Sequence, residues 1–417
     1  MSGLVVIGGS YAGVQAALSA RDAGYAEPIT IISDEDYLPY QRPPLSKAFL
    51  LDAQSEDSLV VRNAAFFEKK TIDLRLGARA DAIDRRARTV TLADGSTLRF
   101  DKLVIGTGSH ARRLPVAGAD LDGVCYLRSI ADAITLKARL REAAEIAVVG
   151  GGFIGLEVAA SASKLGKKVT VIESAPRLLE RAVSPVISDY LLALHRQHGV
   201  TVLLGETVTM VGGDNGKAAF VSCGNGQRIA ADLVLVGIGG IANHAIAQTA
   251  ELNCRDGIVV DEVGRTSDPD IFAAGDCANH YNRFAQRWLR LESVQNAQDQ
   301  AKAAGLAIAG RTEPYASVPR FWSDQYDAKL QIVGLAHGFD RHVTRGDVED
   351  GKFSVFYYKG AQLISVDSIG RPGDQLAARQ MIADGVWPAP EQAADPAFDF
   401  KTLIRRANGA GVSPRDS

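Results

Sequence analysis

Residues 5–24, VVIGGSYAGVQAALSARDAG, and residues 147–166, AVVGGGFIGLEVAASASKLG, decide the fold of this chain. Each stretch begins with a short apolar run, breaks at glycine and continues with helical periodicity, which predicts a strand, a tight turn and a helix. The apolar runs, at 4–7 and 146–149, are typical of strands that are covered on both faces of a parallel sheet. Two copies of this unit predict two nucleotide-binding folds, and a chain that binds two dinucleotides usually passes electrons between them.

The second stretch carries a complete G-x-G-x-x-G pattern, made by Gly150, Gly152 and Gly155. The first glycine allows the turn, the second lets the backbone approach a pyrophosphate, and the third packs the helix on the strand. The helix N-terminus then faces the phosphates. About 20 residues later the pattern requires an acid at the end of the next strand, and Glu173 of VTVIES supplies it. The sequence therefore predicts a dinucleotide site here.

The first stretch departs from this pattern at one position. Gly8 and Gly13 occupy the outer glycine positions, but Ser10 replaces the middle glycine. Its side chain must either turn away from the phosphate or bind it. Asp34 and Glu35, at the end of ITIISDE, are the acids expected to hold ribose hydroxyls.

Composition agrees with a multidomain globular protein. The chain has 417 residues, which predicts two or three domains, and its net charge of −3 gives no general attraction to nucleic acid or to anionic membranes. No apolar run approaches the roughly 20 residues of a membrane span, and the first strand begins too early for a signal peptide. We expect a cytoplasmic protein, and we take a monomer as the default because no coiled-coil heptads appear.

The four cysteines are Cys125, Cys223, Cys254 and Cys277. They form no C-x-x-C pair and have no metal-ligand spacing, which is typical of buried thiols in a reducing compartment. We therefore expect no metal site and no redox disulfide. Cys277 follows Asp276 and is interpreted as a packing residue without a catalytic role.

Further strands end in glycines along the chain. The proline-rich segment 34–50 forbids regular structure until a helix starts near Ser46. A β-rich stretch then leads to a buried strand at 103–105, which closes at residues 106–108, and another buried strand lies in 231–240. Residues 266–278 give a strand that ends at Gly275 and Asp276, and a long helix is expected within 290–310. From about residue 319 the composition favours hairpins.

Five ordered motifs resemble those of one family, and the resemblance covers nearly everything up to about residue 375. They are PYQRPPLSK (39–47), GGGFIGLEVAA (150–160), IFAAGDCA (271–278), RLESVQNAQDQAK (290–302) and FWSDQYDAKLQIVG (321–334). The chain is similar to the flavin-dependent ferredoxin reductases of oxygenase electron-transfer chains, which belong to the glutathione-reductase-like flavoproteins. The resemblance implies an α/β protein with two Rossmann-like domains and a C-terminal α+β domain. The expected divisions are an FAD domain at 1–109 and 241–318, an NADH domain at 110–240, a C-terminal domain at 319–407 and a mobile tail at 408–417.

The resemblance also implies how FAD is held. Lys47 of RPPLSK is expected to face the flavin and to pair with Glu157, so that a fixed cation stabilises the anionic reduced ring. Trp322 is expected close to the flavin or the nicotinamide, where a flat ring excludes water. Lys47, Glu157 and Trp322 are the candidate catalytic residues. The expected FAD contacts are Gly8, Ser10, Gly13, Asp34, Glu35, Arg42, Lys47, Ala80, Thr107, Gly108, Arg128, Asp276, Ser293, Val294 and Trp322.

The second unit is expected to hold NADH. A carboxylate at Glu173 accepts hydrogen bonds from the ribose and repels the extra phosphate of NADPH, although Arg177 or Arg181 could reach such a phosphate. The family usually has proline at the position of Ala242, so we expect a looser return to the FAD domain. The expected NADH contacts are Gly150, Gly152, Ile154, Gly155, Glu173, Arg181, Gly237 and Gly239.

The resemblance implies that hydride passes from NADH to FAD, and that electrons then leave one at a time to a small 2Fe-2S ferredoxin. Ferredoxins are commonly acidic, so Arg283, Arg287 and Arg290 are a candidate docking surface, or else ordinary solvated charges. The sequence leaves two alternatives for the terminal oxygenase of aromatic catabolism, a Rieske-type ring hydroxylase or a haem-thiolate monooxygenase.

Two rival functions share these nucleotide folds. A disulfide or peroxide reductase needs a reactive cysteine near the flavin, and segment 39–50 contains none. A slow NADH-binding flavoprotein that resembles apoptosis-inducing factor works through protein association, and fast turnover with a ferredoxin would distinguish it from a reductase.

Overall fold

The computed structural model describes residues 2–409 of the chain, and it divides into two compact units. The first unit contains residues 2–42, Ser55–His110 and Gly240–Ser317, and the second contains Pro43–Gln54, Ala111–Gly239 and residues 318–409. The division into an FAD, an NADH and a C-terminal domain stays a prediction. The tail expected at 408–417 lies outside the described residues from residue 410 onward.

A parallel five-stranded sheet forms the centre of the first unit, in the order β19-β7-β1-β2-β3. Its strands are β1 (Leu4–Ile7), β2 (Ile29–Ile32), β3 (Ile72–Arg75), β7 (Lys102–Ile105) and β19 (Ile271–Ala273). The predicted strand at 4–7 is confirmed, and all four of its residues are buried because helices and hairpins cover both faces. Strand β19 is far away in sequence, and its pairing with β7 brings the chain after residue 240 into the same sheet.

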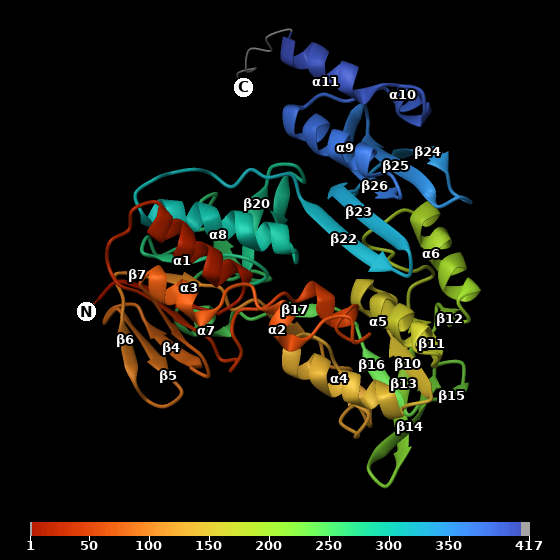
Figure 1. Ribbon diagram of the computed structural model, residues 1–417, viewed down its shortest axis with the longest axis horizontal. Coiled ribbons are helices and arrows are strands. Elements are labelled where there is room, and N and C mark those ends of the chain that lie inside the picture. The colour runs from red at the N-terminus through yellow and green to blue at the C-terminus, as the bar shows by residue number, and fades with distance from the viewer. Residues whose placement is uncertain (1, 410–417) are drawn as a thin grey trace. The chain divides into compact units, whose positions relative to one another are not determined.

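Two helices lie side by side on one face of this sheet (Figure 1), α1 (Tyr11–Asp22) and α8 (Val294–Ile308). Their backbones approach closely, since a Cβ atom on Gly305 would lie 2.5 Å from the Ala16 carbonyl oxygen. The helix expected within 290–310 is thus confirmed. The remaining elements of this unit are α2 (Glu56–Leu59), α3 (Ala64–Lys69), β4 (Ala80–Asp84), β5 (Thr89–Leu92), β6 (Thr97–Arg99), β8 (Ser109–Ala111), β17 (Gly240–Ala242), α7 (Ala245–Thr249), β18 (Ile258–Val260), β20 (Ala278–Asn282) and β21 (Arg287–Leu289).

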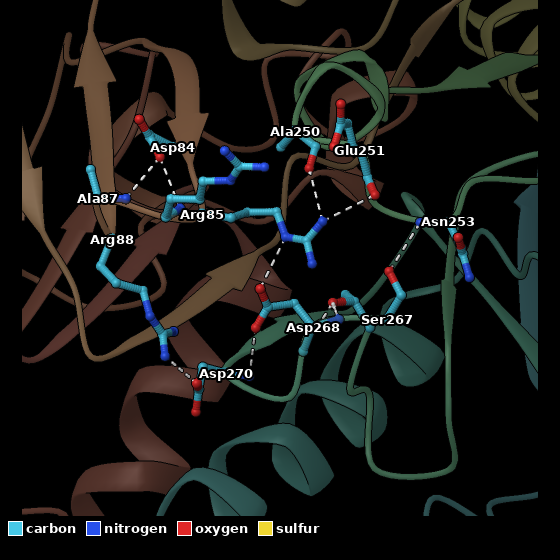
Figure 2. Close-up of polar contacts among 12 residues, drawn as sticks. Asp84, Arg85, Ala87, Arg88, Ala250, Glu251, Asn253, Ser267, Asp268 and Asp270 are labelled. Carbon is cyan, nitrogen blue, oxygen red and sulfur yellow. Dashed lines mark hydrogen bonds and ion pairs between the residues drawn. The ribbon is translucent and has the colours of Figure 1, made fainter.

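An arginine ties three distant segments of the first unit together, as Figure 2 shows. Arg85, in the turn between β4 and β5, donates to Asp268 Oδ2 at 3.0 Å and to the Glu251 carbonyl at 3.2 Å. Nearby, Asp270 accepts hydrogen bonds from Arg88 and Lys102. These contacts hold the β4–β5 hairpin against the segment that enters β19, and so fix the N-terminal end of that strand.

A second parallel sheet, in the order β12-β11-β10-β16-β9, lies in the second unit. Its strands are β9 (Val124–Cys125), β10 (Glu145–Val149), β11 (Lys168–Glu173), β12 (Thr201–Leu204) and β16 (Leu233–Val236). The accompanying elements are α4 (Ile130–Glu142), α5 (Phe153–Lys164), α6 (Pro185–Gln197), β13 (Val208–Asp214), β14 (Lys217–Cys223) and β15 (Arg228–Ala230). The strand expected at 146–149 and the buried strand within 231–240 are confirmed, and both are fully buried over 146–149 and 233–236.

The second unit also contains an antiparallel sheet, in the order β22-β23-β26-β25-β24, which confirms the hairpins expected after residue 319. Its strands are β22 (Arg320–Gln325), β23 (Ala328–Gly334), β24 (Arg341–Asp347), β25 (Lys352–Lys359) and β26 (Gln362–Ile369). Helices α9 (Pro372–Asp384), α10 (Pro390–Ala394) and α11 (Phe400–Gly409) follow it.

The helix expected near Ser46 was wrong. Pro43–Ser46 form a single 3-10 turn, and the next α-helix, α2, begins only at Glu56. The backbone amides of Lys47 and Phe49 both donate to the Pro44 carbonyl, which gives turns instead of a continuous helix. Burial of Phe49 and Leu50 accounts for the difference, because packing those side chains overrides the local helical preference.

Three of the four cysteines are buried and Cys254 is half-buried. The Cys277 thiol is fully enclosed and lies 3.4 Å from the Ile105 carbonyl oxygen, and burial raises its pKa. A thiol in this state is a poor nucleophile, in agreement with its interpretation as a packing residue. Within residues 2–409, no helix is long and apolar enough to cross a membrane, and no His, Cys, Asp and Glu side chains cluster as metal ligands.

An acidic side chain is enclosed in the antiparallel sheet. Asp367 on β26 is fully buried, and its Oδ2 accepts a hydrogen bond of 2.5 Å from the Tyr357 hydroxyl. Its Oδ1 has no hydrogen-bond partner among the described residues. Burial raises the pKa of Asp367 to about 7, against the lowering effect of the Tyr357 hydrogen bond. Because the folded pKa exceeds the unfolded one, this group costs stability increasingly as the pH rises from about 4 to about 7.

We expect Asp367→Asn to raise the free energy of unfolding at pH 8 by roughly 1–3 kcal/mol, since an amide keeps an acceptor for Tyr357 without burying a charge. Urea unfolding at pH 5 and pH 8 measures the effect, which should be larger at pH 8. Asp327→Asn, at an exposed position in the turn between β22 and β23, is the control. Equal stabilisation at both pH values would contradict the assigned protonation.

Candidate functional site

The first glycine turn, between β1 and α1, is built from very close backbone contacts. Gly8 has a φ of +115°, which L side chains rarely adopt, and a Cβ on Gly13 would lie 1.8 Å from the Gly8 carbonyl oxygen. Only glycine fits at both positions. Ser10 precedes the helix, and its Oγ accepts a hydrogen bond of 3.3 Å from Arg42 Nε. The serine that replaces the middle glycine therefore turns toward Arg42.

The acids expected at the end of β2 lie in different environments. Glu35 accepts hydrogen bonds of 2.5 Å from the Tyr40 hydroxyl and from Arg42 Nη2, so it fixes the start of the proline-rich segment. Asp34 is exposed. Ala80 begins β4 just beyond Ala78, whose amide donates to the Ser33 carbonyl at 2.7 Å. The structure thus brings Ala80 to the same end of β2 as the two acids.

Other expected FAD contacts lie at the ends of neighbouring strands. Thr107 and Gly108 follow β7, and the Thr107 hydroxyl donates to the Asn243 carbonyl at 2.6 Å. Asp276 follows β19 and accepts a hydrogen bond of 3.2 Å from Ser109. Because the carboxyl ends of parallel strands meet at one edge, these residues gather where open α/β sheets bind ligands.

Helix α8 begins where the sequence predicted. Ser293 is the N-cap, with its Oγ accepting from the Asn296 amide at 3.1 Å, and Val294 is the first helical residue. The amides of the first turn are therefore directed out of the helix end.

The second glycine turn, between β10 and α5, shows which glycines serve packing and which leave room. A Cβ on Gly155 would lie 2.2 Å from the Gly150 carbonyl oxygen, so packing alone requires glycine there. At Gly152 a Cβ would meet nothing in the protein closer than 3.8 Å. Ile154, in the first turn of α5, is 43% exposed although it is large and apolar. The protein leaves open space in front of this turn, as a site for a pyrophosphate requires.

Glu173, at the end of β11, lies directly beside this turn. Its Oε2 accepts a hydrogen bond of 2.5 Å from the Gly151 amide, and its Oε1 accepts one of 2.7 Å from the Ala175 amide. Arg177 is committed to the loop that follows, donating to the Val183 carbonyl at 2.7 Å and to Ser188 Oγ at 2.9 Å. That leaves a fixed carboxylate where the adenosine ribose is expected, and it takes Arg177 away from a candidate phosphate contact.

The glycines after β16 close the same site. The Gly237 amide donates to the Val149 carbonyl at 2.8 Å, and Gly239 has a φ of +102°. Arg181 is exposed on the loop before α6. Ala242, which stands where the family has proline, is buried in the short strand β17 that pairs with β8. Strand pairing therefore holds this return segment.

A buried carboxylate organises the third group of expected residues. Lys47 Nζ lies 2.8 Å from Glu157 Oε2, which confirms the ion pair expected between them. Glu157 is on α5, only 3% exposed, and it accepts further hydrogen bonds from Ser46 Oγ at 2.5 Å and Ser323 Oγ at 2.8 Å. Three donors compensate for burying this charge.

Trp322 and Arg128 are the two remaining expected contacts in this unit. Trp322 precedes Ser323 on β22, and because strand residues alternate it points to the opposite face, where it is 41% exposed. Arg128 immediately precedes Ser129, the N-cap of α4. An exposed tryptophan beside a buried polar residue is unusual for a packing role, so it stays a candidate cofactor contact.

The two glycine turns and their neighbouring residues therefore have the chemical groups that bind dinucleotides. Each motif has a glycine turn whose last glycine packs so closely that a Cβ would overlap a carbonyl oxygen, a helix N-terminus that follows the turn, and a carboxylate at the end of the second strand. In comparisons with known proteins, the pyridine nucleotide-disulphide oxidoreductase family matches residues 2–301, and a reductase C-terminal family matches residues 320–404. Rhodocoxin reductase of Rhodococcus erythropolis is 44% identical over 403 residues, which cover 97% of this chain and 94% of the relative. The chain belongs to the flavoprotein ferredoxin reductases.

Solved structures agree with this assignment. The ferredoxin reductase for the CYP199A2 system of Rhodopseudomonas palustris has a TM-score of 0.95 at 41% identity, covering 97% of this chain and all of the other. The reductase in the covalent putidaredoxin reductase–putidaredoxin complex has a TM-score of 0.94 at 37% identity, covering 98% of this chain and 99% of the other. This reductase is an oxidoreductase that uses FAD and NAD(H).

The structure changes the interpretation of one arginine. The Arg290 side chain is only 11% exposed and is ion-paired with Glu292 and Asp256, and its guanidinium also donates to the Asp276 carbonyl. An arginine with these internal partners supports the segment after β19, which makes it a weaker candidate for docking than an exposed arginine. Arg283 and Arg287, in contrast, are exposed in the hairpin of β20 and β21.

Sequence reasoning missed several residues of the site. Ser46 and Ser323 donate to Glu157, Tyr40 donates to Glu35, and the Gly151 amide holds Glu173. One signal was available for Ser323, since alternation in FWSDQ separates it from Trp322 and places it on the buried face. The others depend on which segments meet in space.

Gly152→Ala should weaken NADH binding about tenfold while leaving the fold intact, because the new methyl group enters only the space reserved for the pyrophosphate. Gly155→Ala is the matched comparison, and we expect it to destabilise the protein by roughly 1–3 kcal/mol because its methyl group collides with the Gly150 carbonyl. Thermal unfolding and NADH titration of both variants measure these effects. An unchanged affinity for NADH in a folded Gly152→Ala variant would show that the open space is not a ligand site.

Proposed function

We propose that this reductase takes hydride from NADH and delivers electrons to a small 2Fe-2S ferredoxin that serves an oxygenase. Bound FAD supplies the redox chemistry, because it accepts a hydride and releases single electrons. The observation that carries the proposal is the presence of two separate dinucleotide motifs together with the Lys47–Glu157 ion pair. Two similar proteins are reductases of such systems by name: the ferredoxin–NAD(+) reductase component of an anthranilate 1,2-dioxygenase system and the ferredoxin reductase for the CYP199A2 system.

In this proposal the residues of the chain hold the two cofactors in place and supply charge near the flavin. The first glycine turn and Asp276 hold FAD, and the second turn with Glu173 holds NADH. Lys47, fixed by Glu157, supplies positive charge for the reduced flavin, and Trp322 excludes water from it. No side chain acts as a nucleophile, and the enclosed Cys277, with its raised pKa, does not favour a disulfide or peroxide reductase.

Glu173 supports NADH as the preferred donor. Its carboxylate is held by two backbone amides and cannot easily move away from a 2′-phosphate, while Arg177 is occupied by the loop after β11. Like charges within a few ångströms repel, so NADPH is disfavoured.

An anaerobic titration of the purified reductase with NADH, and separately with NADPH, tests this function. We expect rapid bleaching of the flavin by NADH, at least about tenfold slower bleaching by NADPH, and fast reduction of an added 2Fe-2S ferredoxin. Flavin that NADH reduces only over many minutes would favour the slow NADH-binding flavoprotein instead. Fast flavin reduction by NADH without reduction of the ferredoxin would contradict the ferredoxin as acceptor but would support NADH as donor.

The ferredoxin is proposed to dock against Arg283 and Arg287. Both are exposed in the hairpin of β20 and β21, next to the exposed rings of Tyr281 and Trp288, whose centroids lie 6.2 Å apart. Exposed aromatic residues with flanking arginines are typical of the centre of a protein interface, and positive charge suits an acidic ferredoxin.

Charge reversal at both positions, Arg283→Glu with Arg287→Glu, should raise the KM for ferredoxin about tenfold at low salt and weaken its salt dependence. Flavin reduction by NADH should not change. Arg99→Glu is the control, because Arg99 is exposed on β6, at the other side of the same unit (Figure 1). An unchanged KM and salt slope in the double variant would remove this surface from the proposal.

A further inference from the structure

A row of buried polar side chains continues from Glu157 away from Lys47. Ser323 donates to Glu157 Oε1 at 2.8 Å, Gln325 Nε2 lies 3.1 Å from Ser323 Oγ, and Gln325 Oε1 lies 2.9 Å from His195 Nε2. Ser323, Gln325 and His195 are each at most 1% exposed. The row links α5, β22 and α6, and at its outer end the Tyr326 hydroxyl lies 3.4 Å from His195 Nδ1.

The direction of every hydrogen bond in this row follows from the carboxylate. Glu157 accepts from Lys47, so it is the anionic end, and the single hydrogen of Ser323 must point to it. Ser323 Oγ can then only accept, so the amide nitrogen of Gln325 faces it and the amide oxygen faces His195. His195 must therefore carry its proton on Nε2, and Nδ1 is left as the acceptor for the Tyr326 hydroxyl.

Burial fits this neutral form of His195. Desolvation lowers the pKa of His195, against the raising effect of its hydrogen bond to Gln325. The ring is also fixed from outside, because Tyr326 packs edge-on against it with centroids 5.2 Å apart and stacks on His198 at 3.7 Å. Nothing in this arrangement requires His195 to gain or lose a proton.

Aligned hydrogen bonds polarise one another, so a chain in which every donor points the same way stabilises the negative charge at its end more than isolated pairs do. Such a chain does not conduct protons here, because the amide of Gln325 presents distinct nitrogen and oxygen ends that do not exchange roles. What it transmits is position and polarisation.

We propose that Ser323, Gln325 and His195 are positioning residues, a one-way relay that holds Glu157 as a fixed anion and through it holds Lys47 in place for the flavin reaction. This inference rests on the proposed function, because Lys47 matters only if the protein reduces a flavin. The relay explains why the sheet that carries Trp322 also carries Ser323 and Gln325 on its buried face. It also gives a role to His195, which lies on a different helix from Glu157.

The first test reads the relay without the flavin reaction. In nitrogen-15 NMR of histidine-labelled protein, we expect His195 in the Nε2-protonated neutral form, assigned by the signal lost in His195→Gln. Ser323→Ala should shift the His195 Nε2 proton signal, although Ser323 does not touch the imidazole. Ser365→Ala is the matched control, since Ser365 is a buried serine of the same sheet that bonds to the Val333 carbonyl. An Nδ1-protonated His195, or an imidazole signal that does not respond to Ser323→Ala, overturns the relay.

The second test measures hydride transfer from NADH by stopped-flow absorbance. Ser323→Ala and His195→Leu should slow flavin reduction about tenfold, with little change in the Kd for NADH, because a charge-assisted hydrogen bond is lost at the anion or its support is removed. His195→Gln keeps a donor near Gln325 and should retain most of the rate, as should Ser365→Ala. A folded His195→Leu variant with the full rate overturns the inference. If His195→Leu does not fold, the relay is still tested by the tautomer of His195 in the wild-type protein and by the change of its Nε2 proton signal in Ser323→Ala.

These outcomes separate the relay from the proposed function. A wild-type protein whose flavin is reduced by NADH but which does not reduce ferredoxin contradicts the proposed acceptor, and the relay measurements stand unchanged. A wild-type protein that reduces ferredoxin rapidly, but whose His195 signal ignores Ser323→Ala, overturns the relay alone.

Discussion

The close backbone contact inside each glycine turn is the constraint on which both nucleotide sites depend. Gly13 and Gly155 bring a helix so near the end of a strand that a methyl group would overlap a carbonyl oxygen. This contact directs the first amides of α1 and α5 toward the edge of the sheet, where a pyrophosphate can be bound without any positively charged side chain. The carboxylates at the ends of β2 and β11 lie at the same edge, and we propose that they complete each site.

A buried charge creates the second requirement of the structure. Glu157 follows the second turn on α5, and with 3% exposure its carboxylate must be compensated from within the protein. Lys47, Ser46 and Ser323 provide the compensation from segments that are far apart in sequence. The segment after the proline run does not form the expected helix, because Ser46 and Lys47 contact Glu157 and the residues that follow are buried in the core.

Much of the fold could be read from residues with strong local patterns. The strand at 4–7, the strand at 146–149 and the helix within 290–310 occur where periodicity placed them, because each is buried on a face that its own sequence defines. The Lys47–Glu157 pair was also expected, but from a resemblance and not from spacing, since 110 positions cannot be bridged by a local rule. The acidic partners of Arg290 could not be expected, because only the tertiary structure shows them.

The sequence by itself determined the two glycine turns, the acids that follow them and the change to hairpins after residue 319, since these features depend on local backbone geometry and on alternation. Only the tertiary structure decided where Ser10 points, which arginines are exposed, and that His195, Gln325 and Ser323 join Glu157. Those outcomes depend on long-range packing, which places polar groups from separate segments together and leaves each hydrogen bond only one possible direction.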